Sequence, residues 1–304
     1  MNAFTPSAVP CTPGSRTADR PSAVGWRRWA LLRLAFLAVT LLLPVIVAPR
    51  LLDIAMPVAA SPWHAAFVAA RNLAVVVLML VSYRLSVRVL ERRDAAEIDF
   101  RPGGFVAGVG IGTALISVVY MLLYLHGDVT FSAGNGQDGL AFAAIGTLGA
   151  ALVEELVLRA ILFRIAEQVV GTTAAIAFSA IVFGLMHGMN HGATVTSTLA
   201  VALESGVLLA LAYVLTRNLW LAVGIHLGWN FFEGSVYGAA VSGTSATHTA
   251  YSSLLAGPAM LTGGEFGPEA SILSVLACLA ASAVILAVAR RRGNWIGLKF
   301  QLKL

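Results

Sequence analysis

The chain has 304 residues, of which 58% are hydrophobic and only 12% are charged, and its formal net charge is +5. A water-soluble domain carries about 25% charged residues, so this composition excludes an ordinary soluble domain and indicates an integral membrane protein. The basic residues lie in short clusters beside apolar segments, a pattern typical of cytoplasmic anchors and not of a nucleic-acid-binding surface. We therefore expect an all-α fold, a polytopic helical bundle in a lipid bilayer, with no nucleic-acid partner.

Eight apolar runs are long enough, or nearly so, to cross a bilayer as helices. The fold expected from them is a bundle of about eight transmembrane helices around a polar cavity inside the membrane. The two shortest runs, the fifth and the seventh, are near the lower length limit. The predicted spans cover residues 29–48, 63–83, 105–125, 140–163, 172–187, 193–216, 219–237 and 271–289.

The charge pattern divides the chain into three regions. Residues 1–28 are predicted to be a disordered cytoplasmic tail, residues 29–289 the transmembrane domain, and residues 290–304 a basic cytoplasmic tail. With eight spans, the loops rich in arginine fall on the same side as both tails, and the positive-inside rule makes that side cytoplasmic. Arginine far outnumbers lysine, which indicates a bacterial genome, so the expected location is the bacterial inner membrane.

Three charged residues interrupt the apolar run 140–163: Glu154, Glu155 and Arg159. A charge at the centre of a membrane helix costs roughly 2.5 to 3.5 kcal/mol, whereas a Leu, Ile, Val or Phe returns only about 0.3 to 0.6 kcal/mol. These charges should therefore face a protein interior or a wet cavity, and they predict a functional site. Glu155 and Arg159 stand four residues apart in the favourable order for an ion pair, which would fix the helix and the Glu154 rotamer.

Other predicted spans also carry polar residues. His187 lies in the fifth, Glu204 in the sixth, and His226 and Asn230 lie four residues apart in the seventh. Counting about 1.5 Å of rise per residue from the cytoplasmic ends places Glu154, His187, His226 and Asn230 at depths of about 10 to 22 Å. We therefore expect these four side chains to share one layer of the bilayer and one cavity.

These residue types suit hydrolysis of a peptide bond by water. Glu154 and His187 could hold a water molecule and take its proton, while His226 and Asn230 could donate hydrogen bonds to the oxygen that becomes anionic. Alternatively, Glu154, His187 and His226 could form a three-ligand zinc site with one open position. We prefer the mechanism without a metal, keep zinc as the alternative, and expect no other cofactor. The chain has no G-x-S-x-G and no H-E-x-x-H motif.

Three short motifs resemble those of a known family. VEELVLRAILF at 153–163 resembles the E-E-x-x-x-R motif of the CPBP family of intramembrane proteases, also called the Abi or CAAX-protease family, to which the eukaryotic prenyl-protein endopeptidase belongs. FGLMH at 183–187 is similar to its F-x-x-x-H motif, and HLGWN at 226–230 to its H-x-x-x-N motif. The resemblance covers roughly residues 144–237, and its one departure is Ala160, where the family usually has glycine.

The resemblance implies an intramembrane endopeptidase that cuts a peptide bond near the membrane. The family is commonly labelled a metalloprotease family, so the zinc alternative stays open. The residues to which the resemblance assigns roles are Glu154 and His187 for water activation, His226 and Asn230 for the oxyanion, and Glu155 and Arg159 as support.

Three other functions are less consistent with the sequence than a protease. A non-proteolytic homologue could act by binding, for instance in bacteriocin immunity, but every motif side chain is intact. A proton-coupled transporter usually shows repeat symmetry, which the first and last four spans lack. A scaffold would gain only about 0.6 kcal/mol from each interhelical polar pair, too little to offset three charges. The expected partners are the lipid bilayer and a peptide or membrane-protein substrate; the sequence sets neither the substrate's lipidation nor the oligomeric state.

Overall fold

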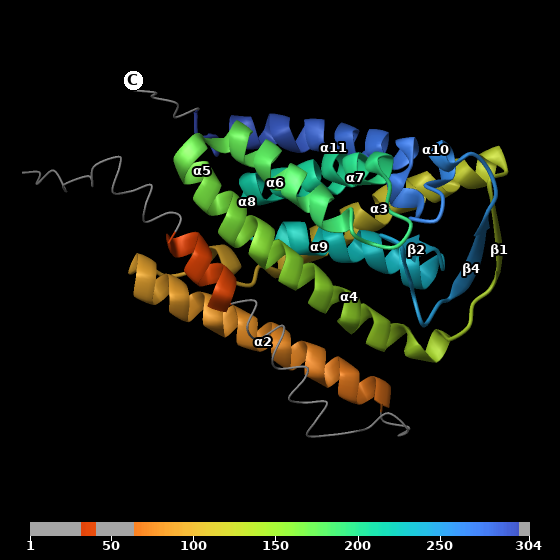
Figure 1. Cartoon of the computed structure of the whole chain (residues 1–304), viewed down its shortest axis with the longest axis horizontal. Helices are drawn as coiled ribbons and strands as arrows, with labels where there is room; N and C mark the ends of the chain where they lie inside the picture. Colours follow the sequence, from red (N-terminus) through yellow and green to blue (C-terminus); the bar gives the residue numbers. More distant parts are fainter. Residues whose placement is uncertain (1–31, 41–63, 298–304) are drawn as a thin grey trace, which may run out of the picture.

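The structure, a computed structural model, describes residues 32–40 and 64–297 of the chain. It is a bundle of helices with two small sheets at one end, which confirms the predicted helical membrane fold (Figure 1). Residues 32–40 are helical. The further α-helices are α2 (His64–Glu91), α3 (Pro102–His126), α4 (Leu140–Glu155), α5 (Arg164–Val170), α6 (Thr172–His187), α7 (Val195–Val201), α8 (Val207–Thr216), α9 (Trp220–Asn230), α10 (Ala259–Thr262) and α11 (Ile272–Arg291).

Shorter helical segments join several of these helices. Three of these segments have the wider π-helical geometry. Segment η3 continues α4 into α5, and η4 continues α7 into α8, so each set forms one long helical rod. The π-segments are η3 (Leu156–Phe163), η4 (Ala202–Gly206) and η5 (Phe231–Val236), and the 3-10 turns are η1 (Ala96–Ile98), η2 (Gln137–Gly139) and η6 (Pro268–Ala270).

Five helices within the described residues are long and apolar enough to cross a membrane: Ala66–Glu91, Pro102–His126, Gln137–Val170, Val195–Thr216 and Ile272–Arg291. The count of eight spans is not confirmed. The predicted span 29–48 lies mostly outside the described residues, α6 has only 16 residues, and the span 219–237 is divided between α9 and η5.

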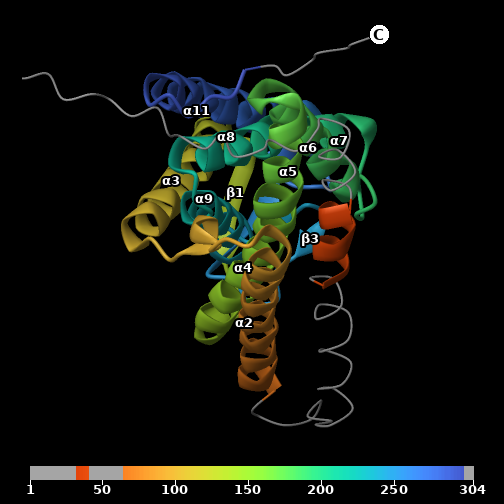
Figure 2. The same cartoon turned by 90° about the vertical axis from the view of Figure 1, so that its left-hand side faces the viewer.

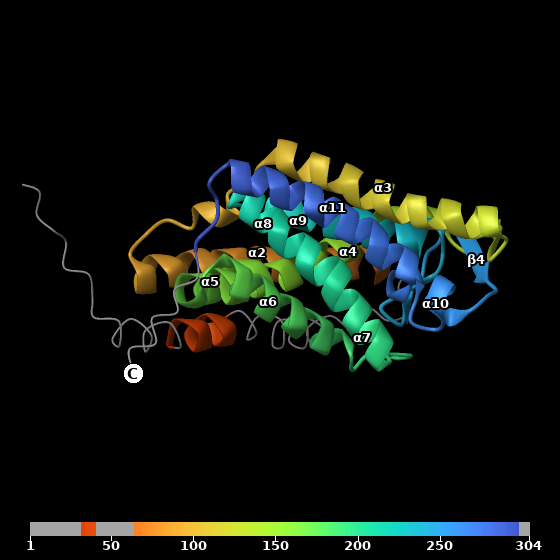
Figure 3. The ribbon, with the colours of Figure 1, turned by 90° about the horizontal axis from the view of Figure 1, so that it is seen from above.

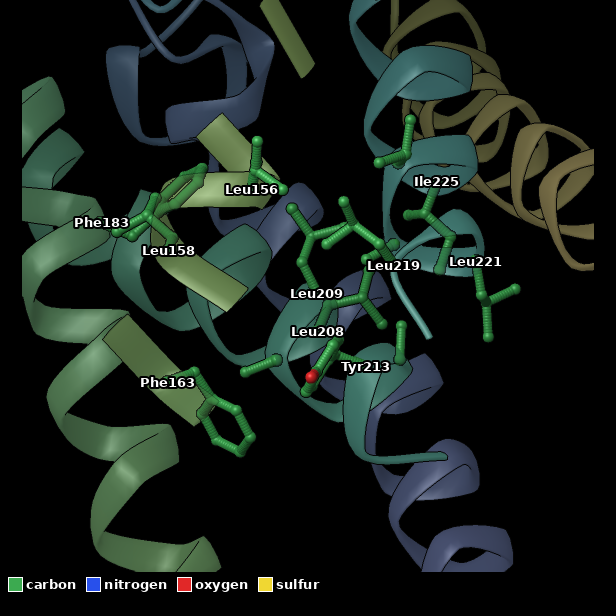
Figure 4. Packing of buried hydrophobic residues seen from close by; sticks show 14 of the residues in the cluster. Leu156, Leu158, Phe163, Phe183, Leu208, Leu209, Tyr213, Leu219, Leu221 and Ile225 are labelled. Atoms are coloured by element: carbon green, nitrogen blue, oxygen red, sulfur yellow. The ribbon is translucent and has the colours of Figure 1, made fainter. Parts of the chain in front are cut away.

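The rod α7–η4–α8 lies at the centre of the bundle. In its most apolar stretch 61% of the residues are buried, against 22 to 33% in the other four spans. Helix α8 packs against α6, α9 and α11, while α2 lies on the outside against α4 (Figures 2 and 3). Figure 4 shows the core around this rod, formed by Leu156, Leu158, Phe163, Phe183, Leu208, Leu209, Tyr213, Leu219, Leu221 and Ile225.

Glycines bring α3 and α9 into close contact. A Cβ at Gly108 or Gly112 would lie 2.4 or 2.1 Å from a carbonyl oxygen of α9, and a Cβ at Gly224 or Gly228 would lie 2.3 Å from one of α3. Each helix thus presents a G-x-x-x-G pattern to the other, and such small residues allow two membrane helices to touch along their backbones. His226 lies between the two α9 glycines, so this contact also positions a predicted site residue.

Two small antiparallel sheets cover one end of the bundle. Strand β1 (Val129–Ala133) pairs with β4 (Tyr251–Leu255), and β2 (Ala240–Val241) pairs with β3 (Thr244–Ser245). Figure 1 shows the β1–β4 ribbon beyond the ends of α3 and α4. The sequence pattern predicts only loops here, because two five-residue strands whose partners lie more than a hundred residues apart leave no local periodicity.

Charged residues gather at the opposite end of the bundle. Glu91 accepts hydrogen bonds from Arg164 at 2.7 and 2.8 Å, and Glu97 accepts them from Arg93 at 2.7 and 2.8 Å and from the Tyr83 hydroxyl. Burial by itself raises the pKa of Glu97, but the hydrogen bonds from Arg93 and Tyr83 outweigh it and hold that pKa below its ordinary value. This network joins the C-terminal part of α2 and the start of α5 to the turn η1.

Candidate active site

Glu154 faces two histidines from two other helices. It occupies the last turn of α4, and its Oε2 atom lies 3.8 Å from Nε2 of His187 and 3.9 Å from Nε2 of His226. His187 is the last residue of α6, and His226 lies in the middle of α9. Both separations exceed the range of a direct hydrogen bond, so the three groups surround a point without bonding to one another.

The Oε2 atom of Glu154 has no hydrogen-bond partner among the residues that the structure describes. The atom is buried, although 27% of the side chain as a whole is exposed. A buried carboxylate oxygen without a donor requires a water molecule or a substrate group. A water that bonds at about 2.8 Å to both Glu154 Oε2 and His187 Nε2 would span their separation. The separation of these two atoms is therefore compatible with one bridging water.

The hydrogen bond made by His187 determines which of its ring nitrogens is free. Its Nδ1 lies 2.8 Å from the carbonyl oxygen of Phe183, one turn earlier, and only an N–H can bond to a carbonyl. In the neutral ring Nε2 is then an acceptor, and it is this atom that faces Glu154. The ring also stacks on Phe183 with 4.6 Å between centroids. Glu154 and His187 thus offer one acceptor to each hydrogen of a water molecule.

His226 is held by the second glutamate of the first motif. Its Nδ1 lies 3.1 Å from Oε1 of Glu155, and both side chains are buried. Because Nδ1–H donates to this carboxylate, Nε2 can donate to an oxyanion only when the ring is an imidazolium. The carboxylates of Glu155 and Glu154 are the counter-charges for that form. The sequence does not predict this contact, since the two residues are 71 positions apart.

The i,i+4 ion pair between Glu155 and Arg159 is present in the structure. Arg159 Nε lies 3.2 Å from Glu155 Oε2, both side chains are fully buried, and the pair lacks the angles of a hydrogen bond. Arg159 Nη2 also donates to the carbonyl oxygens of Ser205 at 3.3 Å and Gly206 at 3.5 Å, and the guanidinium lies 4.8 Å from the Phe183 ring centroid. Arg159 therefore ties the α4–η3 rod to η4 and α6.

Within the described residues, Asn230 and Glu204 make no side-chain hydrogen bond or ion pair with the three facing groups. Asn230 ends α9 one turn after His226, is half-buried, and makes no side-chain hydrogen bond within the described part of the chain. It is therefore free to reach a substrate. Glu204 is buried and accepts hydrogen bonds from Ser205 at 2.8 Å and from the thiol of Cys278 at 3.4 Å. The structure gives neither residue a contact with Glu154.

The three π-helical segments of the described residues all adjoin polar residues of the predicted spans. Segment η3 begins directly after Glu155, η4 contains Glu204, and η5 begins directly after Asn230. π-Turns are rare and occur frequently at functional sites, because they widen a helix locally. Their placement here sets the direction of the site side chains relative to the rest of each helix.

The structure offers no ready metal site. Within residues 32–40 and 64–297, no group of three His, Cys, Asp or Glu side chains is arranged to hold a metal ion. Glu154, His187 and His226 face one another, but they do not form such a group in this arrangement. The zinc alternative therefore stays a prediction, and the reaction proposed below uses side chains and water alone.

Residues 136–232 match the family model described as Type II CAAX prenyl endopeptidase Rce1-like. This segment is similar to the Rce1-like CAAX protease family. The match contains all three motifs at 153–163, 183–187 and 226–230, and it confirms the resemblance with bounds slightly different from 144–237. The comparisons with curated proteins and with solved structures found no match.

The Rce1-like family is a protease family, and the match of this segment to it supports peptidase activity. Together with five helices that can span a bilayer, it identifies the chain as an integral membrane protein. The Rce1-like segment runs from η2 into η5, so it contains the three facing groups and Asn230 but not the β1–β4 ribbon or α11.

Proposed function

We propose that the protein is an intramembrane endopeptidase in which Glu154 and His187 activate a water molecule and His226 with Asn230 stabilises the oxyanion. The observation that supports this most is the convergence on Glu154 Oε2, a buried oxygen that has no donor within residues 32–40 and 64–297 and faces both histidine Nε2 atoms at 3.8 and 3.9 Å. A general base needs a position within reach of a water held by a second acceptor, and this geometry supplies it.

In the proposed reaction, the water donates one hydrogen to Glu154 Oε2 and the other to His187 Nε2. Its oxygen attacks the carbonyl carbon of the substrate as Glu154 takes the proton. The carbonyl oxygen becomes anionic and accepts hydrogen bonds from Nε2–H of the His226 imidazolium and from the Asn230 amide. Glu154 then passes its proton to the leaving amine, the C–N bond breaks, and Glu154 is a carboxylate again.

The proposed substrate is a peptide or a segment of a membrane protein that reaches the layer of the bilayer containing Glu154. The family description names prenyl endopeptidases, so a peptide with a prenylated C-terminal tail is one substrate class to test beside unmodified peptides.

The test is cleavage of a peptide library, with and without prenylated members, by the purified protein in proteoliposomes. Glu154→Gln keeps the shape of the side chain and removes the base, so it should abolish cleavage while the thermal midpoint stays within a few degrees. Glu265→Gln is the matched control, since Glu265 is exposed in the loop before η6. Turnover by Glu154→Gln equal to that of the wild type would overturn the proposal. A folded wild type that cleaves no member would favour a homologue that acts by binding.

We also propose that the chain lies in a bacterial inner membrane with both termini in the cytoplasm, which the arginine clusters beside its apolar segments support. A cysteine introduced at exposed Gln137 or Glu265 should then react with a membrane-impermeant thiol reagent added from outside. The background for this test is Cys11→Ser, in which the one native cysteine left, Cys278, is buried and should not react. Labelling of either position only after the membrane is opened would contradict this orientation.

A further inference from the structure

A second group of acidic side chains takes no part in the proposed reaction. Glu204, Glu233 and Glu269 are buried, with relative exposures of 1, 0 and 4%. The hydrogen-bond donors that the structure gives them are neutral: indole, hydroxyl, thiol and backbone N–H groups. A buried carboxylate is costly unless such bonds hold it, so a specific structural task is expected of each. The contacts of Glu233 and Glu269 show what that task is.

Glu233 joins the end of α9 to the turn η6. Its Oε2 accepts a hydrogen bond from Nε1 of Trp229 at 2.8 Å, and its Oε1 accepts one from the backbone N–H of Glu269 at 3.0 Å. Trp229 directly precedes Asn230, and Glu233 lies within η5, the π-segment that directly follows it. One carboxylate therefore holds both sides of Asn230 against a loop 36 residues further along the chain.

Glu269 continues the same chain of hydrogen bonds toward His187. Its Oε1 accepts a hydrogen bond from the Ser242 hydroxyl at 2.6 Å, and the Ser242 carbonyl accepts one from the Asn190 amide at 3.0 Å. The backbone N–H of Asn190 in turn donates to the carbonyl of His187 at 3.1 Å. A continuous path thus runs from the end of α9 through two buried glutamates to the end of α6.

Close backbone packing around Gly243 holds this path in place. The N–H of Gly243 donates to the Phe266 carbonyl at 2.7 Å, and a Cβ on Gly243 would lie 1.9 Å from the carbonyl oxygen of His191. Gly243 also has a φ of +76°, a conformation that favours glycine. The hairpin 240–245 is therefore pressed between the loop that follows α6 and the loop that precedes η6.

We propose that Glu233 and Glu269 are positioning residues for the proposed reaction, because they fix the ends of α9 and α6 so that Asn230 and His187 keep their places around Glu154. The inference rests on the proposed function. Helix α6 ends at His187, and α9 passes into the π-segment η5 directly after Asn230, so the backbone leaves the regular α-helical hydrogen-bond pattern at both site residues. A displacement of about 1 Å at a catalytic group lowers the rate by roughly 10²-fold, so such an anchor acts on turnover.

The experiment measures kcat and KM for a peptide that the wild type cleaves. In Glu233→Gln the amide has one oxygen acceptor and turns its NH₂ toward a second donor, so one of the two bonds is lost. We expect kcat to fall roughly 10- to 100-fold with KM changed by less than about threefold. Glu265→Gln, in the exposed part of the same loop, should leave both constants unchanged. Wild-type kcat in Glu233→Gln would overturn the inference.

A double-variant cycle separates positioning from general damage. Trp229→Phe removes the indole donor to Glu233, so the double variant with Glu233→Gln should lose little more than the worse single variant, because both changes break one contact. Losses that multiply would overturn the inference. If Glu233→Gln does not fold, Trp229→Phe and Ser242→Ala test the same path, and unchanged kcat in both overturns it. Activity in Glu154→Gln would sink the proposed function itself, whereas an inactive Glu154→Gln beside a fully active Glu233→Gln would sink only this inference.

Discussion

Nδ1 of His226 lies 3.1 Å from Oε1 of Glu155, and both side chains are buried. The other oxygen of the same carboxylate faces Arg159 at 3.2 Å. Glu155 therefore connects the first motif to the third, and it orients the imidazole whose Nε2 faces Glu154. Its role is larger than the helix-fixing ion pair that spacing alone predicts.

Replacing Glu155 should damage both stability and activity. Glu155→Ala leaves Arg159 buried without its counter-charge and removes the acceptor for His226, and breaking a buried pair in this way costs roughly 3 to 5 kcal/mol. Thermal unfolding and kcat measured on the same preparation check this. Asp99→Ala is the control, because its ion pair with Arg84 has side chains 59 and 55% exposed and should contribute less than about 1 kcal/mol. Normal stability with normal turnover in Glu155→Ala would contradict the proposed link.

Removing the Asn230 amide should slow the chemical step alone. Asn230→Ala is expected to lower kcat by roughly 10² to 10³, the usual effect of losing one oxyanion donor, with little change in KM. Steady-state kinetics on one peptide measure both constants. An unchanged kcat would show that the Asn230 side chain lies away from the developing charge.

Metal dependence is decided by metal content and chelation. If His226 acts as an imidazolium donor, a strong chelator should leave activity unchanged. If it is instead a zinc ligand, His226→Ala should release metal from the purified protein, and a chelator should inactivate the wild type until zinc is restored. His126, whose side chain is 67% exposed, gives the control variant His126→Ala. Stoichiometric zinc that tracks activity would contradict the metal-free mechanism.

The glycine contact between α3 and α9 predicts a difference between two neighbouring positions. Gly108→Val places a side chain against the α9 backbone, so it should destabilise the protein by roughly 1 to 3 kcal/mol and reduce activity, since α9 carries His226. Gly110→Val on the same helix should do neither, because nothing lies within 4 Å of its Cβ position. Thermal midpoints in one detergent compare the two variants. Equal midpoints would show that the helices do not touch along their backbones.

Acid should weaken the network that contains Glu97. Its pKa in the folded protein lies below the ordinary value of 4.5, so the unfolded chain takes up the proton first as the pH falls. The stabilisation is therefore complete above about pH 4.5 and is lost as the pH falls through the folded-state pKa. The thermal midpoint of the wild type should drop over this window more steeply than that of Glu97→Gln. Asp99→Asn should keep the wild-type slope, and parallel curves for wild type and Glu97→Gln would count against the network.

Two physical rules predict part of the site from the sequence alone: the cost of a charge inside a membrane helix and the fixed rise per residue of that helix. Charges inside an apolar run single out Glu154, Glu155 and Arg159, and counting residues from the helix ends places Glu154 in the same layer as His187 and His226. In the structure Glu154 Oε2 lies 3.8 and 3.9 Å from the two histidine Nε2 atoms, and the catalytic roles of the three residues stay a prediction.

The remaining features depend on contacts between distant segments. Glu233 lies within a largely apolar run of the sequence. It can bond to both Trp229 and Glu269 only because the segment before α11 folds back onto η5. The contact of Glu155 with His226 is likewise set by how α4 packs on α9. Packing also selects π- over α-geometry after Glu155 and Asn230, and no residue pattern in one chain signals that choice.

The π-segments have a consequence for insertions and deletions. A π-turn accommodates one residue more than an α-turn, so losing one residue from η5 could restore α-geometry there without disturbing α9 before it. A residue lost between Trp229 and Glu233 would leave the chain beyond η5 nearly in phase, but it would place Glu233 three residues after Trp229 instead of four and so disturb the hydrogen bond between them. Chain length between Asn230 and the following hairpin should therefore tolerate change far less than the identity of the apolar residues that fill it.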